Sequence, residues 1–155
     1  MIIGAKKVTT KQQGQCIMPH NHQHVLGNFH MAGENEVSEA IESSMLAWNT
    51  WSKTSIEERT KIFRKAAELL QGPWRDTINA ATMLNQSKNA FQAEIDAACE
   101  LIDFFNFNCQ YAEDIHNNQP LISPEGVKNS LEYRPLEGFV FAITPFNFTS
   151  IAGNL

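Results

Sequence analysis

Short stretches of alternating polar and apolar residues open the chain, and they predict β-structure. The run MIIGAKKVTT is typical of a short strand followed by a turn. The run CIMPHNHQHVLGNFHMA is typical of a second strand region, with a break near Gly27. We therefore expect residues 1–34 to form an amino-terminal β segment.

Helical periodicity follows, and it predicts a helical part over residues 35–116. Ser55 stands three residues before Glu58, which is the spacing of a capping box at the start of a helix. Gly72 and Pro73 end that helix, and Pro73 also suits the first turn of a third helix. The predicted inward face of the helix before Ser55 comprises Val37, Ile41, Met45 and Trp48.

The longest predicted helix runs from about residue 89 to residue 114. Its apolar positions are spaced by seven, three and four residues, with further apolar residues beside them. Such a broad apolar surface indicates a helix that is covered on more than one side. The residues concerned are Phe91, Ala98, Leu101 and Phe105, with Ile95, Ile102 and Phe104 beside them.

The pattern becomes extended again after this helix. NNQPLISPEG has the composition of a linker, and the alternation in NSLEYRPLEG indicates an exposed strand, so residues 117–137 are interpreted as linker and exposed strand. GFVFAIT is continuously apolar, as in a buried parallel strand, and a helix could begin near Ser150. Residues 138–155 therefore look like the first half of a βαβ unit, a strand and a turn without the crossover and the return strand, and the predicted class is α/β, incomplete.

Composition and charge exclude several classes of protein. Over 155 residues, hydrophobic residues make up 43% and charged residues 19%, which is globular, and the net charge of −5 argues against nucleic-acid binding. No apolar run reaches the roughly 20 residues of a membrane span, and the start lacks a signal-peptide core. Three cysteines without paired spacing favour a reducing compartment, so we expect a cytoplasmic protein without a membrane partner.

Two groups of residues could carry chemistry or could be structural. His20, His22 and His24 alternate, so on a strand they would share one face and could bind a metal, or they are half-exposed residues beside a turn. Glu94 lies on the same stripe as Leu101, so it is either a site group with a shifted pKa or one end of an interior salt bridge.

The stretch ITPFNF offers a third candidate. Pro145 has a fixed φ angle and favours an extended backbone at Thr144, so the predicted strand ends in a rigid bend. Asn147 follows two residues later, at the carboxyl end of the strand, where ligands bind in open α/β sheets. Its amide either donates a hydrogen bond to the oxygen of a tetrahedral intermediate or caps the following helix.

At these residues the chain resembles a known family. PLEGFVFAITPFNFTSIAGNL is similar to the aldehyde dehydrogenase superfamily, whose first nucleotide-domain strand ends in such a turn. QAEIDAACELIDFFNFN, AAELLQGPWR and PHNHQHVLGNFH resemble its 1-pyrroline-5-carboxylate dehydrogenase branch, so the resemblance covers nearly the whole chain. It implies an NAD-dependent oxidation of L-glutamate γ-semialdehyde, a small aldehyde, to L-glutamate by an intact enzyme that is a homo-oligomer.

The resemblance also implies a role for each matching residue. Asn147 becomes the amide that stabilises the oxyanion, Phe148 lines the aldehyde channel, and Glu94 lies near the substrate entrance. The histidines have no metal role. The residues implied to lie along NAD are Ile143, Thr144, Pro145 and Phe146.

The resemblance covers only the amino-terminal portion of such an enzyme. The nucleophilic cysteine of the family follows the Asn147 turn, whereas Cys16, Cys99 and Cys109 precede it, so we expect this chain alone to be inactive. If the source is eukaryotic, we expect the protein in the mitochondrial matrix instead of the cytoplasm, with a targeting segment that precedes Met1. The rival hypotheses are a gene remnant and a non-catalytic module that adds its apolar end to the sheet of a partner.

Overall fold

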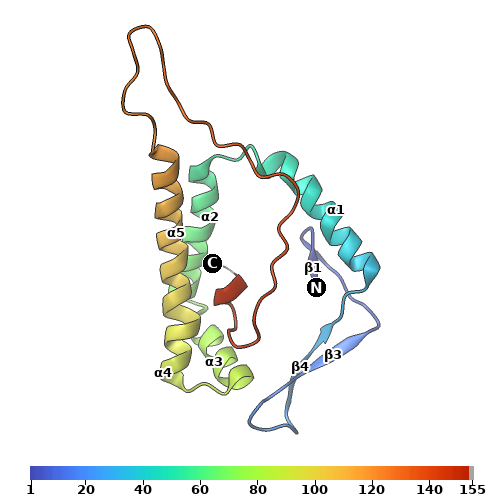
Figure 1. Ribbon diagram of the computed structural model, residues 1–155. Coiled ribbons are helices and arrows are strands. Elements are labelled where there is room, and N and C mark those ends of the chain that lie inside the picture. The colour runs from blue at the N-terminus through green and yellow to red at the C-terminus, as the bar shows by residue number, and fades with distance from the viewer. Residues whose placement is uncertain (154–155) are drawn as a thin grey trace.

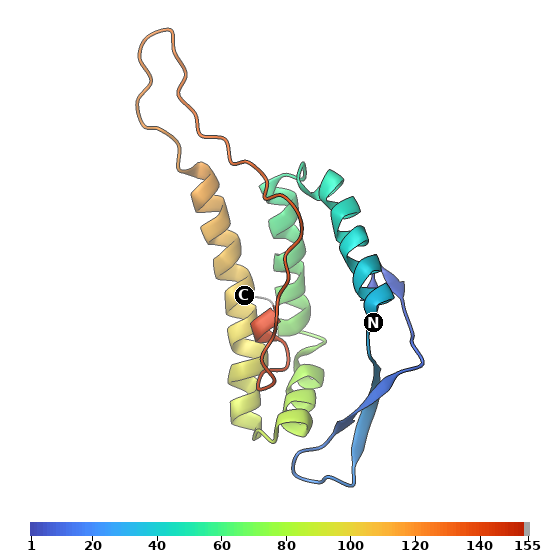
Figure 2. The ribbon, with the colours of Figure 1, turned by 45° about the vertical axis from the view of Figure 1, so that its right-hand side comes forward.

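The computed structural model describes residues 1–153 as two short β-hairpins, a layer of helices and a long carboxyl-terminal segment (Figures 1 and 2). The strands are β1 (Ile2–Ile3), β2 (Lys6–Lys7), β3 (Gln13–Ile17) and β4 (Val25–His30). The helices are α1 (Glu34–Trp51), α2 (Ile56–Gln71), α3 (Arg75–Gln86), α4 (Ala90–Ala93) and α5 (Glu100–Asn117), with the π-helical η1 (Glu94–Cys99) and the 3-10 helix η2 (Ile151–Gly153). The predicted mixture of short amino-terminal strands and a helical layer is confirmed. None of the described helices has the length and apolarity needed to cross a bilayer.

The second hairpin corrects the sequence-based prediction for the histidines. β3 and β4 pair antiparallel, and the chain reverses between them through Asn21, whose backbone N–H donates to the Met18 carbonyl at 3.1 Å. His20, His22 and His24 therefore lie in the connection and not on one face of a strand. The break predicted near Gly27 is a register shift inside the hairpin, because Cys16 pairs with Gly27 and Ile17 with Val25, and the polar run before β4 makes the turn.

The caps of the helices follow local sequence signals. The Ser55 hydroxyl accepts a hydrogen bond from the Glu58 backbone N–H at 3.2 Å, so the predicted N-cap of α2 is confirmed. Gly72 is the C-cap of α2, as predicted. α3 begins at Arg75, two residues after Pro73, which lies in the turn between the two helices.

The longest predicted helix is interrupted by a π-helical segment. Asn89 caps α4, and η1 then connects α4 to α5. Because a π-helix closes hydrogen bonds between residues five apart, it changes the phase of the helix face relative to a regular 3.6-residue period. Ala98 and Leu101 are 0% and 2% exposed as predicted, whereas Phe91, seven residues before Ala98, is 75% exposed.

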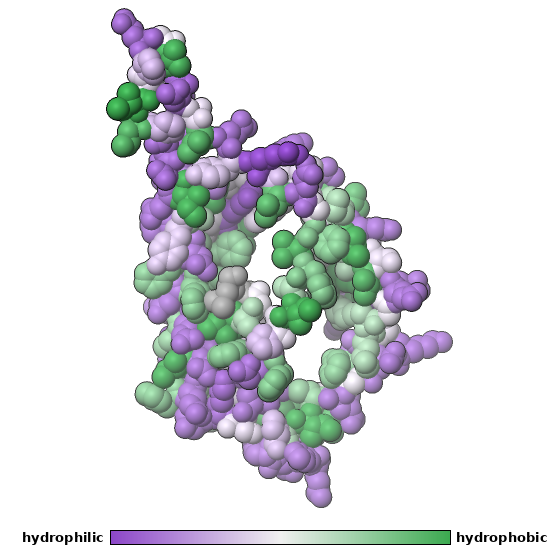
Figure 3. Space-filling model, viewed as in Figure 1, coloured by the Kyte–Doolittle hydropathy of each residue, from purple (hydrophilic) through white to green (hydrophobic). Residues whose placement is uncertain are grey.

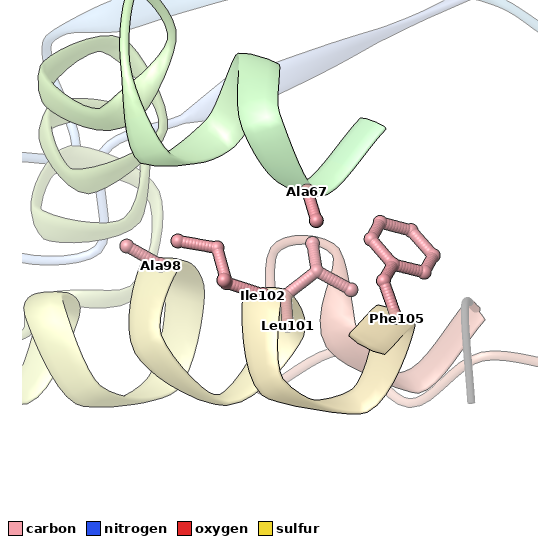
Figure 4. Close-up of a cluster of buried hydrophobic side chains, with 5 residues drawn as sticks. All are labelled: Ala67, Ala98, Leu101, Ile102 and Phe105. Atoms are coloured by element: carbon pink, nitrogen blue, oxygen red, sulfur yellow. The ribbon is translucent and has the colours of Figure 1, made fainter. Parts of the chain in front are cut away.

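The core lies between α2 and α5 (Figure 4). Ala67 of α2 faces Leu101, Ile102 and Phe105 of α5, and its small side chain allows the two helices to pack closely. Phe63 extends this packing, since its ring centroid lies 5.8 Å from that of Phe105. α3 and η1 pack against this pair of helices, and α4 packs against α3 and η1.

The carboxyl-terminal segment differs from its prediction. Residues 118–144 form no paired strand within residues 1–153, so the exposed strand expected before residue 137 and the buried strand expected at 138–144 are present only as unpaired chain. Val140 and Ile143 are 83% and 82% exposed, and Figure 3 shows apolar side chains of the chain at the surface. A strand needs a neighbouring strand for its ladder of hydrogen bonds, and within residues 1–153 none lies beside this segment.

Candidate functional site

The segment around Asn147 forms a turn that folds back on itself. Phe146 and Asn147 lie in the turn directly after Pro145, and Phe146 is 95% exposed. The chain then returns through η2, where a Cβ placed on Gly153 would come within 3.2 Å of the Thr144 methyl group. Ile151 of η2 is buried, and in both ribbon views η2 lies beside α2 and α5 (Figures 1 and 2). The helix expected near Ser150 is thus a short 3-10 helix, and residues 154 and 155 lie outside the described residues.

Two polar contacts hold this turn against the helical layer. The Lys88 ammonium donates a hydrogen bond to the main-chain carbonyl of Asn147 at 2.9 Å and lies 4.6 Å from the centroid of the Phe148 ring. The hydroxyl oxygens of Thr149 and Thr82 are 2.6 Å apart. Thr82 is completely buried on α3, so the turn is attached to an interior position of the helical layer.

The side chain of Asn147 is exposed. Within residues 1–153, its amide group makes no hydrogen bond, and only its main-chain carbonyl is engaged. Among the described residues, the Asn147 side chain therefore does not cap a helix, which was the alternative that the sequence left open. An exposed amide on an anchored turn is a hydrogen-bond donor available to a ligand.

The residues expected along NAD are at the surface of the same turn. All four of them, Ile143, Thr144, Pro145 and Phe146, are exposed, and Phe148 is half-buried. The Phe148 ring faces the Lys88 ammonium, a cation–π contact that orients it. The structure thus brings the predicted oxyanion donor and the predicted cofactor and channel residues together in one short turn.

Glu94 occupies the first position of η1 and is bound to α3. Its carboxylate forms an ion pair with Arg75, whose Nε lies 2.9 Å from Oε1, and accepts a hydrogen bond from the Asn79 amide at 2.5 Å. The Arg75 guanidinium, and then the Asn79 amide, hold the pKa of Glu94 below its ordinary value. Its side chain is 36% exposed, so Glu94 is half-buried, and its pair with Arg75 is the salt bridge that the sequence offered as one alternative. Among the described residues its hydrogen bonds go to α3 and to Cys99, and none reaches the turn.

The cysteines are free thiols in ordinary structural surroundings. Burial, followed by the nearby Glu94 carboxylate, raises the pKa of Cys99. Burial also raises the pKa of Cys109, whose Sγ contacts the Thr60 carbonyl. The Cys16 thiol donates to the Asn85 side-chain oxygen at 2.6 Å. The raised pKa values leave the thiols of α5 and η1 protonated at neutral pH, so they are poor nucleophiles.

The structure adds residues that sequence reasoning missed. Lys88 and Asp96 form an ion pair at 2.5 Å beside the turn, and Thr82 anchors it from below. Lys88 and Asp96 are eight residues apart, across the start of α4, which is not a spacing of neighbours on a regular helix. No pattern in the sequence therefore pointed to them. Across residues 1–153 no group of three or more histidine, cysteine or acidic side chains is arranged to hold a metal ion, and His20 is hydrogen-bonded to Ser87 at 2.8 Å.

Comparison with known proteins gives a consistent set of relatives. The model of the aldehyde dehydrogenase family matches residues 7–153, a range that includes both Glu94 and Asn147. The probable delta-1-pyrroline-5-carboxylate dehydrogenase of Schizosaccharomyces pombe is 47% identical over 155 residues, which are 100% of this chain and 28% of that protein. The mitochondrial delta-1-pyrroline-5-carboxylate dehydrogenase of Homo sapiens is 46% identical over 154 residues, which are 99% of this chain and 27% of that protein.

Solved structures show the same similarity in three dimensions. The crystal structure of the delta-pyrroline-5-carboxylate dehydrogenase from Mycobacterium tuberculosis matches with a TM-score of 0.94 and 49% identity. The match covers 99% of this chain and 29% of that one, and a crystal structure of the same protein bound with NAD matches with the same TM-score. The chain thus spans less than a third of the length of these relatives, and within that span its turn and helical layer have the fold of theirs.

Proposed function

The chain belongs to the aldehyde dehydrogenase family, and on that premise we propose that it forms part of an NAD-dependent dehydrogenase that oxidises L-glutamate γ-semialdehyde to L-glutamate. This semialdehyde is the open-chain form of 1-pyrroline-5-carboxylate. The proposal is supported by relatives that are 46–47% identical and are named delta-1-pyrroline-5-carboxylate dehydrogenases. Because the chain spans about 28% of their length, it supplies one portion of such a site.

The observation that carries the proposal is the exposed, unengaged amide of Asn147 on an anchored turn. When a thiolate attacks an aldehyde carbon, the carbonyl oxygen becomes negatively charged. An N–H group held in place before the reaction stabilises this charge without having to reorganise, and such a donor contributes about 3–4 kcal/mol to the transition state. We assign this role to the Asn147 amide. The attacking thiolate belongs to a cysteine outside residues 1–155, since the three thiols of this chain are buried or hydrogen-bonded.

The chemistry of the turn fits NAD as the cofactor. Its outer surface combines the exposed apolar side chains of Ile143 and Phe146 with the hydroxyl of Thr144, which suits a flat ring with polar edges. We propose that residues 143–146 hold part of NAD there. When bound, NAD supplies the hydride acceptor for the oxidation.

Phe148 and Glu94 are proposed to contact or attract the substrate. The Phe148 ring, oriented by Lys88, lines the aldehyde channel and keeps water away from the reacting carbon. Glu94 is ionised at neutral pH, because Arg75 and Asn79 lower its pKa. A carboxylate near the substrate entrance attracts the ammonium group of the semialdehyde, and the neighbouring Arg75 moderates this attraction.

Two further expectations remain proposals. We propose that the intact enzyme is a homo-oligomer. We also propose a reducing compartment, because all three cysteines are free. The name of the human relative places that protein in mitochondria, so the matrix and the cytoplasm are both compatible with the thiols of this chain.

The test is Asn147→Ala in the complete gene product, assayed by NADH formation from glutamate semialdehyde. We expect kcat to fall by about 100-fold to 1,000-fold. The KM for NAD should change little, because the amide acts on the reacting oxygen. Asn118→Ala, which removes another exposed amide, is the matched control and should leave kcat unchanged. An unchanged kcat in Asn147→Ala would contradict the proposal.

A further inference from the structure

The connection between α3 and α4 consists of Ser87, Lys88 and Asn89, and it is held rigidly at both ends. Ser87 ends α3 in the left-handed region at φ 53°, a conformation that turns the chain sharply. Asn89 caps α4: its side chain accepts from the Gln92 backbone N–H at 2.9 Å, and the Gln92 side chain accepts from the Asn89 backbone N–H at 3.0 Å. Lys88 therefore starts from a well-defined backbone position between two capped helix ends.

The Lys88 ammonium is largely enclosed and has three partners. It lies 2.5 Å from the Asp96 carboxylate and 2.9 Å from the Asn147 carbonyl, and it faces the Phe148 ring at 4.6 Å. The Lys88 side chain is 18% exposed and that of Asp96 is 27% exposed. Burying an ammonium this far is costly unless it is paired and hydrogen-bonded, and these partners meet that requirement.

These contacts act on the peptide group that follows the Asn147 Cα. The carbonyl that Lys88 holds is attached to the same Cα as the side chain that carries the predicted oxyanion donor. Fixing that carbonyl restricts rotation of the main chain at Asn147 and so restricts the direction in which the amide points. The contact with Phe148 holds the next residue at the same time. One cation thus orients both side chains that the proposed site requires.

We infer that Lys88 is a positioning residue for the dehydrogenase reaction, and that it orients Asn147 and Phe148 through its hydrogen bond to the Asn147 carbonyl. This inference rests on the proposed function of Asn147. Asp96 supports Lys88 by neutralising its charge and holding the ammonium beside the turn. A purely structural role would instead make the Lys88–Asp96 pair a stabiliser of the helical layer, with no specific effect on the turn.

The experiment compares Lys88→Met with Lys65→Met in the complete gene product. Methionine keeps most of the length of the side chain and removes the charge and all three donors. Lys65 forms an exposed ion pair with Glu68 on α2, so its substitution is the matched control for the loss of an ion-paired ammonium. Amide hydrogen exchange of residues 144–151 is measured together with kcat and with the KM for NAD and for the semialdehyde.

We expect Lys88→Met to speed exchange in residues 144–151 and to lower kcat by about tenfold or more, because a hydrogen bond to a charged group is lost. The expected change in the KM for NAD is less than about twofold, because residues 143–146 remain exposed on the same turn. Lys65→Met should behave like the wild type in every measurement. Unchanged exchange and kcat in Lys88→Met would overturn the inference.

A double variant separates this inference from the function on which it rests. If Lys88 acts through Asn147, adding Lys88→Met to Asn147→Ala lowers kcat no further, because the group that is positioned has already been removed. If Lys88→Met lowered kcat by the same factor in the wild type and in Asn147→Ala, the inference would be contradicted. If Asn147→Ala alone left kcat unchanged, the proposed function would fail regardless of Lys88. If Asn147→Ala lowers kcat and Lys88→Met does not, only the role of Lys88 fails.

Discussion

The hydroxyl oxygens of Thr82 and Thr149 lie 2.6 Å apart, although 67 positions separate the two residues in the chain. Thr82 is completely buried on α3, and its own hydroxyl donates to the Ile78 carbonyl at 2.8 Å. Since a hydroxyl has one hydrogen to donate, Thr149 is the donor between the two threonines. The turn that carries Asn147 is therefore attached to the helical layer by a directed hydrogen bond.

Thr82→Val tests this attachment. Valine keeps the volume but removes the acceptor, which leaves the Thr149 hydroxyl without its partner, so we expect a loss of about 1–3 kcal/mol in the free energy of unfolding. Urea denaturation measures the loss, and Thr82→Ser, which keeps the hydroxyl, should lose less. Adding Thr149→Val to Thr82→Val should lower the free energy of unfolding little further, because the Thr149 hydroxyl that had lost its partner is then removed. Strictly additive losses would show that the two hydroxyls do not interact.

The Arg75–Glu94 ion pair predicts a pH dependence of stability. The folded-state pKa of Glu94 lies below its ordinary value of 4.5, first because of Arg75 and then because of Asn79. A lowered carboxyl pKa stabilises the folded state above pH 4.5, and this contribution is lost as the pH falls through the folded-state pKa. Arg75→Met should therefore lower the Tm most at neutral pH, and its difference from the wild type should shrink in acid.

Thermal unfolding of both proteins between about pH 3 and pH 7 measures this difference. Arg134→Met is the matched control, because the Arg134–Glu137 pair is exposed, with side chains 81% and 70% accessible. Its effect on the Tm should be small at every pH. A Tm difference between Arg75→Met and the wild type that stays constant into acid would refute the assignment.

Leu101→Ala tests the core between α2 and α5, and Phe91→Ala tests the effect of η1 on the helix face. Leu101 is 2% exposed, so truncating it leaves a cavity, and we expect a loss of about 2–5 kcal/mol in the free energy of unfolding. Phe91 is 75% exposed, so its truncation should change stability by less than about 0.5 kcal/mol. Equal losses would mean that the helix continues regularly through residues 94–99.

Ser55→Ala tests the start of α2. The Ser55 hydroxyl satisfies the Glu58 backbone N–H, so its removal should cost about 1 kcal/mol, measured by urea denaturation. Ser44→Ala is the control, because among residues 1–153 the Ser44 hydroxyl donates to the Ala40 carbonyl alone, within an exposed part of α1. A loss as large for Ser44→Ala as for Ser55→Ala would argue against the cap.

The chain comprising residues 1–155 alone should form no NADH from glutamate semialdehyde above the blank. Covalent oxidation of an aldehyde requires an accessible thiolate, and burial raises the pKa of Cys99 and Cys109. The complete gene product, assayed in parallel, is the positive control. Aldehyde-dependent NADH formation by the chain alone would contradict the prediction, and substitution of each cysteine in turn would then identify the thiol responsible.

The sequence by itself determined the features that depend on neighbouring residues. The caps at Ser55 and Gly72 were predictable, because a cap is satisfied by backbone groups three or four positions away. The same holds for the bend after Pro145, since proline restricts its own backbone and that of the residue before it. The predicted inward face of α1 was wrong, because Val37 and Met45 are 52% and 44% exposed and no residue of α1 is buried. The family resemblance of the Asn147 turn also lay in the sequence, and the match over residues 7–153 confirmed the family.

Only the tertiary structure decided the features that need a distant partner. No local pattern placed Lys88 against the Asn147 carbonyl or Thr82 against Thr149, because those contacts join residues 59 and 67 positions apart. The π-helical η1 exposed Phe91 through a change of helix phase that a regular period does not contain. The apolar residues 138–144 have the composition of a strand, but a strand exists only where another strand pairs with it, and pairing is a property of the assembled fold.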